Sequence, residues 1–172
     1  MNYILYTSLP SIMNAQLRDL IEEAKRDPSL FSSIDVDKLL DSLENVKNEY
    51  LDGQTMQSVT QDIFDSIHSL PIAKSLVHDF CNKLVGYRFV DEIYQLHRGK
   101  HVRWIRHTNP EKMMVGGIVV DVKFTDDGVN VLCRLHSGRF TQYRFDQCLT
   151  FQKLTDDEQL LLMIYEDPEF HT

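Results

Sequence analysis

Basic and aromatic residues are concentrated between residues 97 and 107, around the chain's single tryptophan, Trp104. Lysine and arginine side chains bind phosphate groups, and an exposed aromatic ring stacks on nucleic-acid bases. This pattern is typical of a nucleic-acid-binding strip, to which later basic residues would contribute. The candidate phosphate-binding residues are Arg98, Lys100, Arg103, Arg106, Lys123, Arg134, Arg139 and Arg144. The alternative is that Trp104 fills a core while the basic residues face water for solubility.

A second candidate set is aromatic. Rings at strand ends can form a cage that holds methylated lysine or arginine through cation–π attraction. The competing interpretation is that most of these rings form a hydrophobic core. The candidate platform or cage residues are Trp104, Phe124, Phe140, Tyr143 and Phe145.

No motif for catalysis, phosphate binding or metal ligation is found in the sequence. His97 and His101 are four residues apart, but Gly99 between them argues against a helix that would align both on one face. The three cysteines lack the close paired spacing of a zinc site and are typical of buried, reduced thiols. We therefore expect a protein that is not an enzyme and has neither a cofactor nor a metal.

The elements that must position these residues lie between Lys100 and Leu154. Short segments rich in β-branched and aromatic residues alternate there with turn signals, among them the Asp127-Gly128 pair of a hairpin. Closing such strands into a barrel would remove the exposed edges of the sheet. The sequence therefore predicts a small five-stranded antiparallel barrel. Its strands are expected at 101–106, from Gly116-Gly117 to 124, at 129–135, at 140–145 and around Leu149 and Phe151.

Alternation within the strands predicts which side chains share a face. In the second strand, one face is expected to carry Ile118, Val120, Val122 and Phe124, and the other Val119, Asp121 and Lys123. In the third strand, we expect Val129, Val131, Cys133 and Leu135 to point inward.

This order of features resembles a known group of small barrels. A Lys-x-Val-x-Trp-Ile strand beginning at Lys100 is followed by a longer loop, a Gly-Gly-Ile-Val-Val-Asp-Val-Lys-Phe strand, an Asp-Gly hairpin and an aromatic fourth strand. The pattern is similar to Tudor and Src-homology-3-like barrels and covers about a third of the chain. The resemblance implies a binding module, including a Tudor-like reader of methylated residues. The flanking helices and the 151–154 segment are also similar to uncharacterised small proteins of large double-stranded DNA viruses.

Helices are predicted on both sides of the barrel. Apolar residues at three- and four-residue spacing predict four helices that form a bundle, at Ser8–Asp27, Asp35–Leu51, Thr55–His68 and from about 72 to 85. Residues 87–96 are predicted as a short helix, and the alternative is a strand at Glu92–Leu96 that pairs with His101–Arg106. Thr155 and Glu158 form a capping box that opens a C-terminal helix from Asp156. The fold class is α+β, with a helical domain (1–86), a connection (87–99), the barrel (100–154) and a C-terminal helix with an acidic tail (155–172).

Charge is distributed unevenly along the chain. The net charge is −8, yet residues 87–153 contain 11 Lys and Arg against 7 Asp and Glu. A basic middle between acidic flanks fits either a module that binds polyanions or an ordinary solvated surface. No apolar run is long enough to cross a membrane, and no signal-peptide core is present, so an intracellular location or a virion is expected. The leading hypothesis is a non-catalytic interaction or assembly module that binds another protein, and the alternative is a nucleic-acid-binding protein. Further alternatives are a Tudor-like reader of methylated residues and an enzyme whose site is not visible in the sequence.

Overall fold

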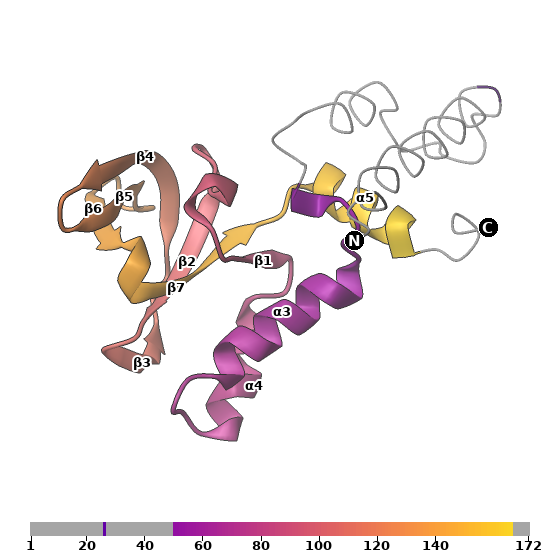
Figure 1. The fold of residues 1–172 in the computed structure, drawn as a ribbon, viewed down its shortest axis with the longest axis horizontal. Coiled ribbons are helices and arrows are strands. Elements are labelled where there is room, and N and C mark those ends of the chain that lie inside the picture. Colours follow the sequence, from indigo (N-terminus) through magenta and orange to yellow (C-terminus); the bar gives the residue numbers. More distant parts are fainter. Residues whose placement is uncertain (1–25, 27–49, 167–172) are drawn as a thin grey trace, which may run out of the picture. The chain divides into compact units, whose positions relative to one another are not determined.

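In the computed structural model of the chain, the described residues are Arg26 and residues 50–166 (Figure 1). They fall into two compact units. One contains Gln57–Leu154, and the other contains the described residues up to Met56 together with those from Thr155 onward. The predicted helix at Ser8–Asp27 and nearly all of that at Asp35–Leu51 lie outside the described residues.

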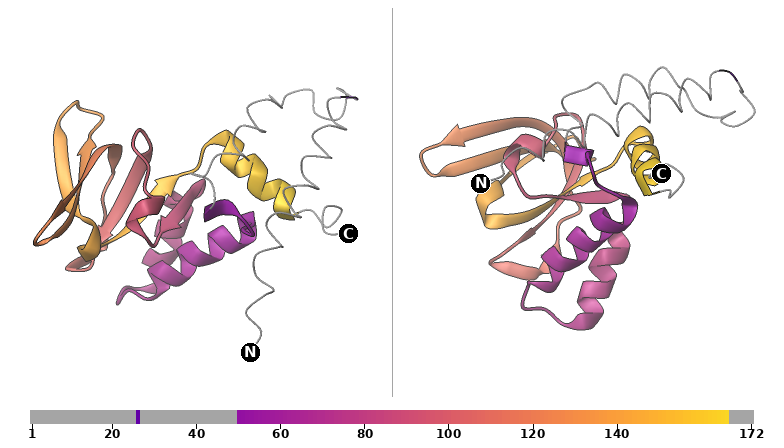
Figure 2. Two further views of the ribbon diagram at one scale, coloured as in Figure 1. Left: turned by 45° about the horizontal axis from the view of Figure 1, so that its top comes forward. Right: turned by 45° about the vertical axis from the view of Figure 1, so that its right-hand side comes forward.

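Three α-helices occur in the described part of the chain, and the two that belong to the predicted bundle of four, α3 and α4, pack against the sheet. Helix α3 spans Met56–His68 and helix α4 spans Lys74–Lys83. The buried residues of α3 are Val59, Ile63 and Ile67, which follow one another every four residues along a single stripe. Ile63 and Ile67 of this stripe pack on the sheet, and α3 and α4 lie side by side (Figures 1 and 2). The unit that contains the sheet, Gln57–Leu154, which we call the sheet unit, thus extends across residue 86, where the sequence predicted a domain boundary.

The sheet has seven antiparallel strands instead of the predicted five. In the described residues its order is β1-β7-β2-β4-β5-β6, with β3 paired to β2 alone, so it is an open sheet and not a closed barrel. The strands are β1 Tyr87–Val90, β2 His101–Arg106, β3 Asn109–Met113, β4 Gly117–Thr125, β5 Gly128–Arg134, β6 Phe140–Arg144 and β7 Cys148–Lys153.

The helix predicted at 87–96 is wrong. Tyr87–Val90 forms strand β1, paired with Lys153–Thr150 of β7, and is followed by a one-turn 3₁₀ helix at Ile93–Gln95. Pairing with a strand some sixty residues later decides this segment, because tertiary hydrogen bonds override a weak local preference. Strand β3 was not predicted. It contains Pro110, which an edge strand tolerates.

The predicted face of β4 is also wrong in its first half. Val119 is the buried residue, at 1% exposed, whereas Ile118 and Val120 are 40% and 39% exposed. The register with β5 shifts between Val119 and Asp121, so a β-bulge interrupts the alternation. Val119 and Val122 both pack on the core as a result. In β5, Val131 and Cys133 point inward as predicted.

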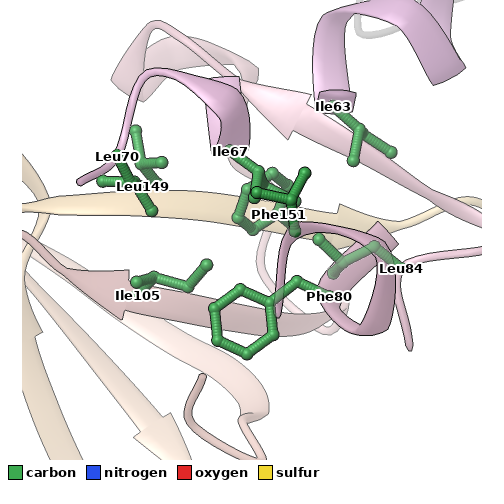
Figure 3. Close-up of a cluster of buried hydrophobic side chains, with 9 residues drawn as sticks. Ile63, Ile67, Leu70, Phe80, Leu84, Ile105, Leu149 and Phe151 are labelled. Carbon is green, nitrogen blue, oxygen red and sulfur yellow. The ribbon is translucent and has the colours of Figure 1, made fainter. Parts of the chain in front are cut away.

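Two hydrophobic clusters lie on opposite sides of the central strands. The first joins α3 and α4 to β2 and β7, and Figure 3 shows the helix side chains meeting Ile105, Leu149 and Phe151. The second lies between β1, β2, β4, β5 and β6. Its buried members are Val90, Leu96, Val102, Trp104, Val119, Val131, Cys133 and Tyr143. Strand β2 contributes to both clusters because its successive side chains point to opposite faces.

The C-terminal helix is confirmed as α5, Asp156–Glu166, in the second unit. Its capping box is present: the Glu158 amide donates to Thr155 Oγ1 at 3.1 Å, and the Thr155 amide donates to Glu158 Oε2 at 2.6 Å. The Tyr50 hydroxyl donates to the other carboxylate oxygen of Glu158. Both oxygens of the Glu158 carboxylate therefore accept hydrogen bonds at the start of α5.

Candidate binding surface on the sheet

One face of β4, β5 and β6 is exposed, because the helix cluster packs on the sheet at β1, β2, β3 and β7. We call it the outer face. Ile118 of β4 is paired with Arg134 of β5, which is paired with Phe140 of β6. Directly paired residues project to the same side of a sheet, so these three side chains form one row. Ile118 and Phe140 are 40% and 61% exposed, and the cationic Arg134 lies between them.

A half-open pocket of about 530 Å³ lies at the end of this row. We call it the groove. It is lined by His101 of β2, residues 115–118 at the start of β4, and residues 134–137 at the end of β5. Arg134 and the imidazoles of His101 and His136 are the ionisable groups in this lining, and none of the lining residues is Asp or Glu. The groove thus combines positive charge with the apolar side chains of residues 115, 118 and 135.

Gly116 and Gly117 bring the three strands of the groove together. A Cβ atom on Gly116, where φ is +91°, would lie 2.0 Å from the carbonyl oxygen of Val102 on β2. A Cβ atom on Gly117 would lie 2.7 Å from the carbonyl oxygen of Arg134 on β5. Only glycine permits approaches this close, and they align His101, Ile118 and Arg134 across adjacent strands.

His101 is held by a neighbouring phenol. Its Nδ1 lies 3.0 Å from the Tyr87 hydroxyl oxygen. Burial, together with the charges of Arg103 and Lys153, lowers the pKa of His101 below its ordinary 6.5, while burial raises the pKa of Tyr87. The phenol therefore keeps its proton and the imidazole is neutral, and the tautomer of the ring decides which of the two donates in this hydrogen bond. His101 is a neutral hydrogen-bonding group at neutral pH rather than a fixed charge.

The basic residues of the predicted strip do not form one continuous surface. Arg103 is half-buried, and its guanidinium donates to the carbonyl oxygens of Met114 at 3.3 Å and Lys83 at 3.2 Å. Arg98 forms an ion pair with Asp121. Lys100 is half-buried, and its carbonyl oxygen accepts the Val119 amide, while Arg106 is exposed at the end of β2.

Three of the later basic residues lie on one face of the sheet. Lys123 and Arg144 both pair with Asn130, so they share the outer face with Arg134. Arg144 lies 3.4 Å from Asp146, whereas Arg134 makes no ion pair within the described residues. Arg139 is exposed in the turn before β6.

The candidate aromatic residues separate into core and surface. Trp104 and Tyr143 are 1% and 3% exposed and stack on each other with ring centroids 4.3 Å apart. Phe145 packs against the same cluster. Phe124 and Phe140 are exposed, but they pair with Val129 and Arg134, at opposite ends of β5. Five residues of strand separate two sites by about 17 Å, so these rings do not line one cage.

The thiols are poorly suited to nucleophilic chemistry. Burial raises the pKa of Cys133 to about 12 and that of Cys148 to about 11, so both remain protonated near neutral pH. Among residues 50–166 and Arg26, no three His, Cys, Asp or Glu side chains are grouped as metal ligands. None of the described helices is long and apolar enough to cross a membrane.

Comparison of the chain with protein-family models, with curated proteins and with solved structures found no match. The groove must therefore be interpreted from its own chemistry. Sequence reasoning identified Arg134 as a cation but missed Val115, Leu135 and His136 as its neighbours in the groove. Gly116-Gly117 was the available signal, because paired glycines in a strand indicate a close backbone approach.

Proposed function

We propose that the chain is a non-catalytic interaction module that binds another protein through its outer face. The observation that carries this proposal is the exposed row of Ile118, Arg134 and Phe140 beside the groove. Exposed apolar residues grouped next to charge are typical of protein-binding surfaces. Aromatic and arginine side chains also contribute the largest share of binding energy at such surfaces.

The strand order supports the proposed resemblance to Src-homology-3-like and Tudor modules. The five strands recognised in the sequence, β2, β4, β5, β6 and β7, are arranged with β7 beside β2, and a one-turn 3₁₀ helix at Phe145–Gln147 connects β6 to β7. Src-homology-3 domains bind peptides on aromatic-lined grooves. The distance between Phe124 and Phe140 favours a general peptide-binding module over a reader of methylated residues.

The electrostatics support binding over catalysis. The described thiols and phenols with shifted pKa values are shifted toward their protonated forms, which are the less nucleophilic ones. The accessible polar groups of the groove are instead a guanidinium and imidazoles, which recognise ligands by charge and hydrogen bonding.

Nucleic-acid binding is a second candidate, now centred on the outer face instead of the 98–106 strip. It is favoured by the placement of Lys123, Arg134 and Arg144 on one side of the sheet. Fluorescence anisotropy with single- and double-stranded oligonucleotides at two salt concentrations tests it. Binding that weakens steeply with salt, and weakens less steeply in Lys123→Glu, would favour nucleic acid. No binding at low salt would exclude this surface as a nucleic-acid site.

Site-specific photo-crosslinking tests the protein-binding proposal. p-Benzoylphenylalanine would replace Phe140, and the matched control would carry it at Tyr94, which is 75% exposed on the 3₁₀ helix outside the outer face. In a lysate of the source organism, the Phe140 probe should give a discrete protein adduct that disappears in Ile118→Asp. The same adducts from both probes, or none from either, would refute the proposal.

A further inference from the structure

The groove differs from the rest of the outer face in having no acidic residue in its lining. Elsewhere on this face, Asp121 is paired with Arg98, and Asp146 lies beside Arg144. Arg134 has no such partner in the part of the chain that the structure describes. A guanidinium offers several N–H donors in a planar arrangement that matches the two oxygens of a carboxylate. Arg134 can therefore form an ion pair with a carboxylate of a ligand.

We propose that the groove takes an acidic peptide segment of a protein partner, in which an aspartate or glutamate lies next to a large apolar residue. The carboxylate binds Arg134 and His136, and the apolar side chain packs on Ile118 and Leu135. This assignment rests on the proposed function, because it names the chemistry of the partner that the outer face binds.

The apolar part of the lining favours a peptide over a nucleic acid. Val115 is 79% exposed and Ile118 is 40% exposed, and both line the groove. A phosphate backbone offers no apolar group to cover them, and it is normally held by many cations, whereas the groove has one permanent cation. A peptide with adjacent acidic and apolar residues satisfies both kinds of lining.

His101 contributes recognition without adding fixed charge. Because the Tyr87 hydroxyl bonds to Nδ1, Nε2 is the ring nitrogen that remains to form a hydrogen bond with the peptide. The hydrogen bond with Tyr87 also fixes the orientation of the ring. His101 therefore adds directionality to the ion pair that Arg134 makes.

A displayed library of random peptides of about ten residues, selected on the full-length protein, tests this inference. Selected peptides should be enriched in Asp or Glu beside Leu, Ile, Phe or Trp. Arg134→Glu should weaken their binding roughly tenfold or more, since a charge-assisted contact is lost and a repulsion is added. The matched control is Arg139→Glu, an equally large charge change on an exposed residue outside the groove, which should alter binding by less than about twofold. Melting temperatures of both variants would verify that they fold.

Repeating the selection on Arg134→Glu supplies a positive result. Enrichment should change from acidic to Lys- or Arg-containing peptides, which a mere loss of folding would not produce. The inference is overturned if the wild-type protein enriches no peptides, enriches peptides without carboxylates, or binds oligonucleotides through Arg134 at physiological salt. If the Phe140 crosslink persists while the selection fails, only the acidic-segment assignment is lost. If both fail, the proposed function is lost with it.

Discussion

Replacing Gly116 with alanine should destabilise the sheet unit much more than the same replacement at Gly99. Both glycines have positive φ, +91° and +81°, so alanine is strained at either position. They differ in their surroundings. A Cβ atom at Gly99 meets nothing within 4 Å, whereas one at Gly116 lies 2.0 Å from the Val102 carbonyl oxygen. The pair therefore separates backbone strain from steric overlap.

The expected magnitudes follow from these contacts. A positive φ costs an alanine about 1–2 kcal/mol, and the lower entropy of its unfolded chain returns about 0.4–1 kcal/mol. Gly99→Ala should therefore lower the free energy of unfolding by about 1 kcal/mol. At Gly116, β2 and β4 must also separate where His101 pairs with Ile118 and Val102 with Gly117. Lost hydrogen bonds at about 1 kcal/mol each and overpacking at about 1–3 kcal/mol raise the total to about 3–5 kcal/mol.

Equilibrium urea unfolding, followed by tryptophan fluorescence, measures both values. Trp104 is the chain's single tryptophan and is 1% exposed against Tyr143, so its emission reports unfolding of the sheet unit. Equal losses of stability in the two variants would refute the reasoning, because they would show that β4 can move away from Val102 without cost. A Gly116→Ala chain that is unfolded in buffer would agree with the upper end of the range.

Three further predictions follow from burial, capping and titration. Phe151→Ala should cost about 3–5 kcal/mol in the same assay, because Phe151 is fully buried, whereas Phe124→Ala should cost less than about 0.5 kcal/mol at 74% exposure; similar values would contradict the packing. Thr155→Ala should cost α5 about 1 kcal/mol and speed hydrogen exchange at the Glu158 amide, whereas Thr155→Ser should retain the cap; unchanged exchange would count against the capping box. The pKa of His101 in the folded chain lies below its ordinary 6.5, so the unfolded chain binds a proton on this imidazole at a higher pH than the folded chain does. The contribution of His101 to the free energy of unfolding is therefore complete above pH 6.5 and is lost as the pH falls below it. His101→Gln should accordingly show a smaller fall in stability between about pH 7 and pH 5.5, and an unchanged slope would oppose this assignment.

Local signals in the sequence were sufficient for much of the sheet. His101–Arg106 was predicted with its observed bounds, and the Asp127-Gly128 pair correctly indicated the hairpin between β4 and β5. Both depend on neighbours in sequence: β-branched and aromatic residues in the first case and turn geometry in the second. The C-terminal helix followed from its capping box in the same way.

The errors arose where distant residues decide the structure. Phe89, Val90 and Ile93 have a spacing that suits a helix, but β7 offers Tyr87–Val90 a full set of pairing partners. The β4 bulge adds one residue to the strand, so that Val119 is buried and Ile118 is exposed, opposite to the predicted alternation. No local feature of the sequence indicated this bulge. The groove also depends on contacts between distant residues. Its lining comes from β2, β4 and β5 and their adjoining turns, and it lies where the helices leave the sheet uncovered. The sequence therefore identified Arg134 as a candidate binding residue, but it did not show which residues lie beside it in the groove.

The sharing of β2 and β7 between two clusters determines the smallest part of the chain that can be expected to fold alone. A fragment of residues 87–154 would retain the Trp104 cluster, but it would expose Ile105, Leu149 and Phe151 on the face that α3 and α4 cover in the whole chain. The apolar surface that these three side chains form would then be in contact with water, and an exposed apolar surface of this kind favours self-association. A fragment of residues 57–154 retains both clusters, so the two helices are part of the folding unit and not an attached domain.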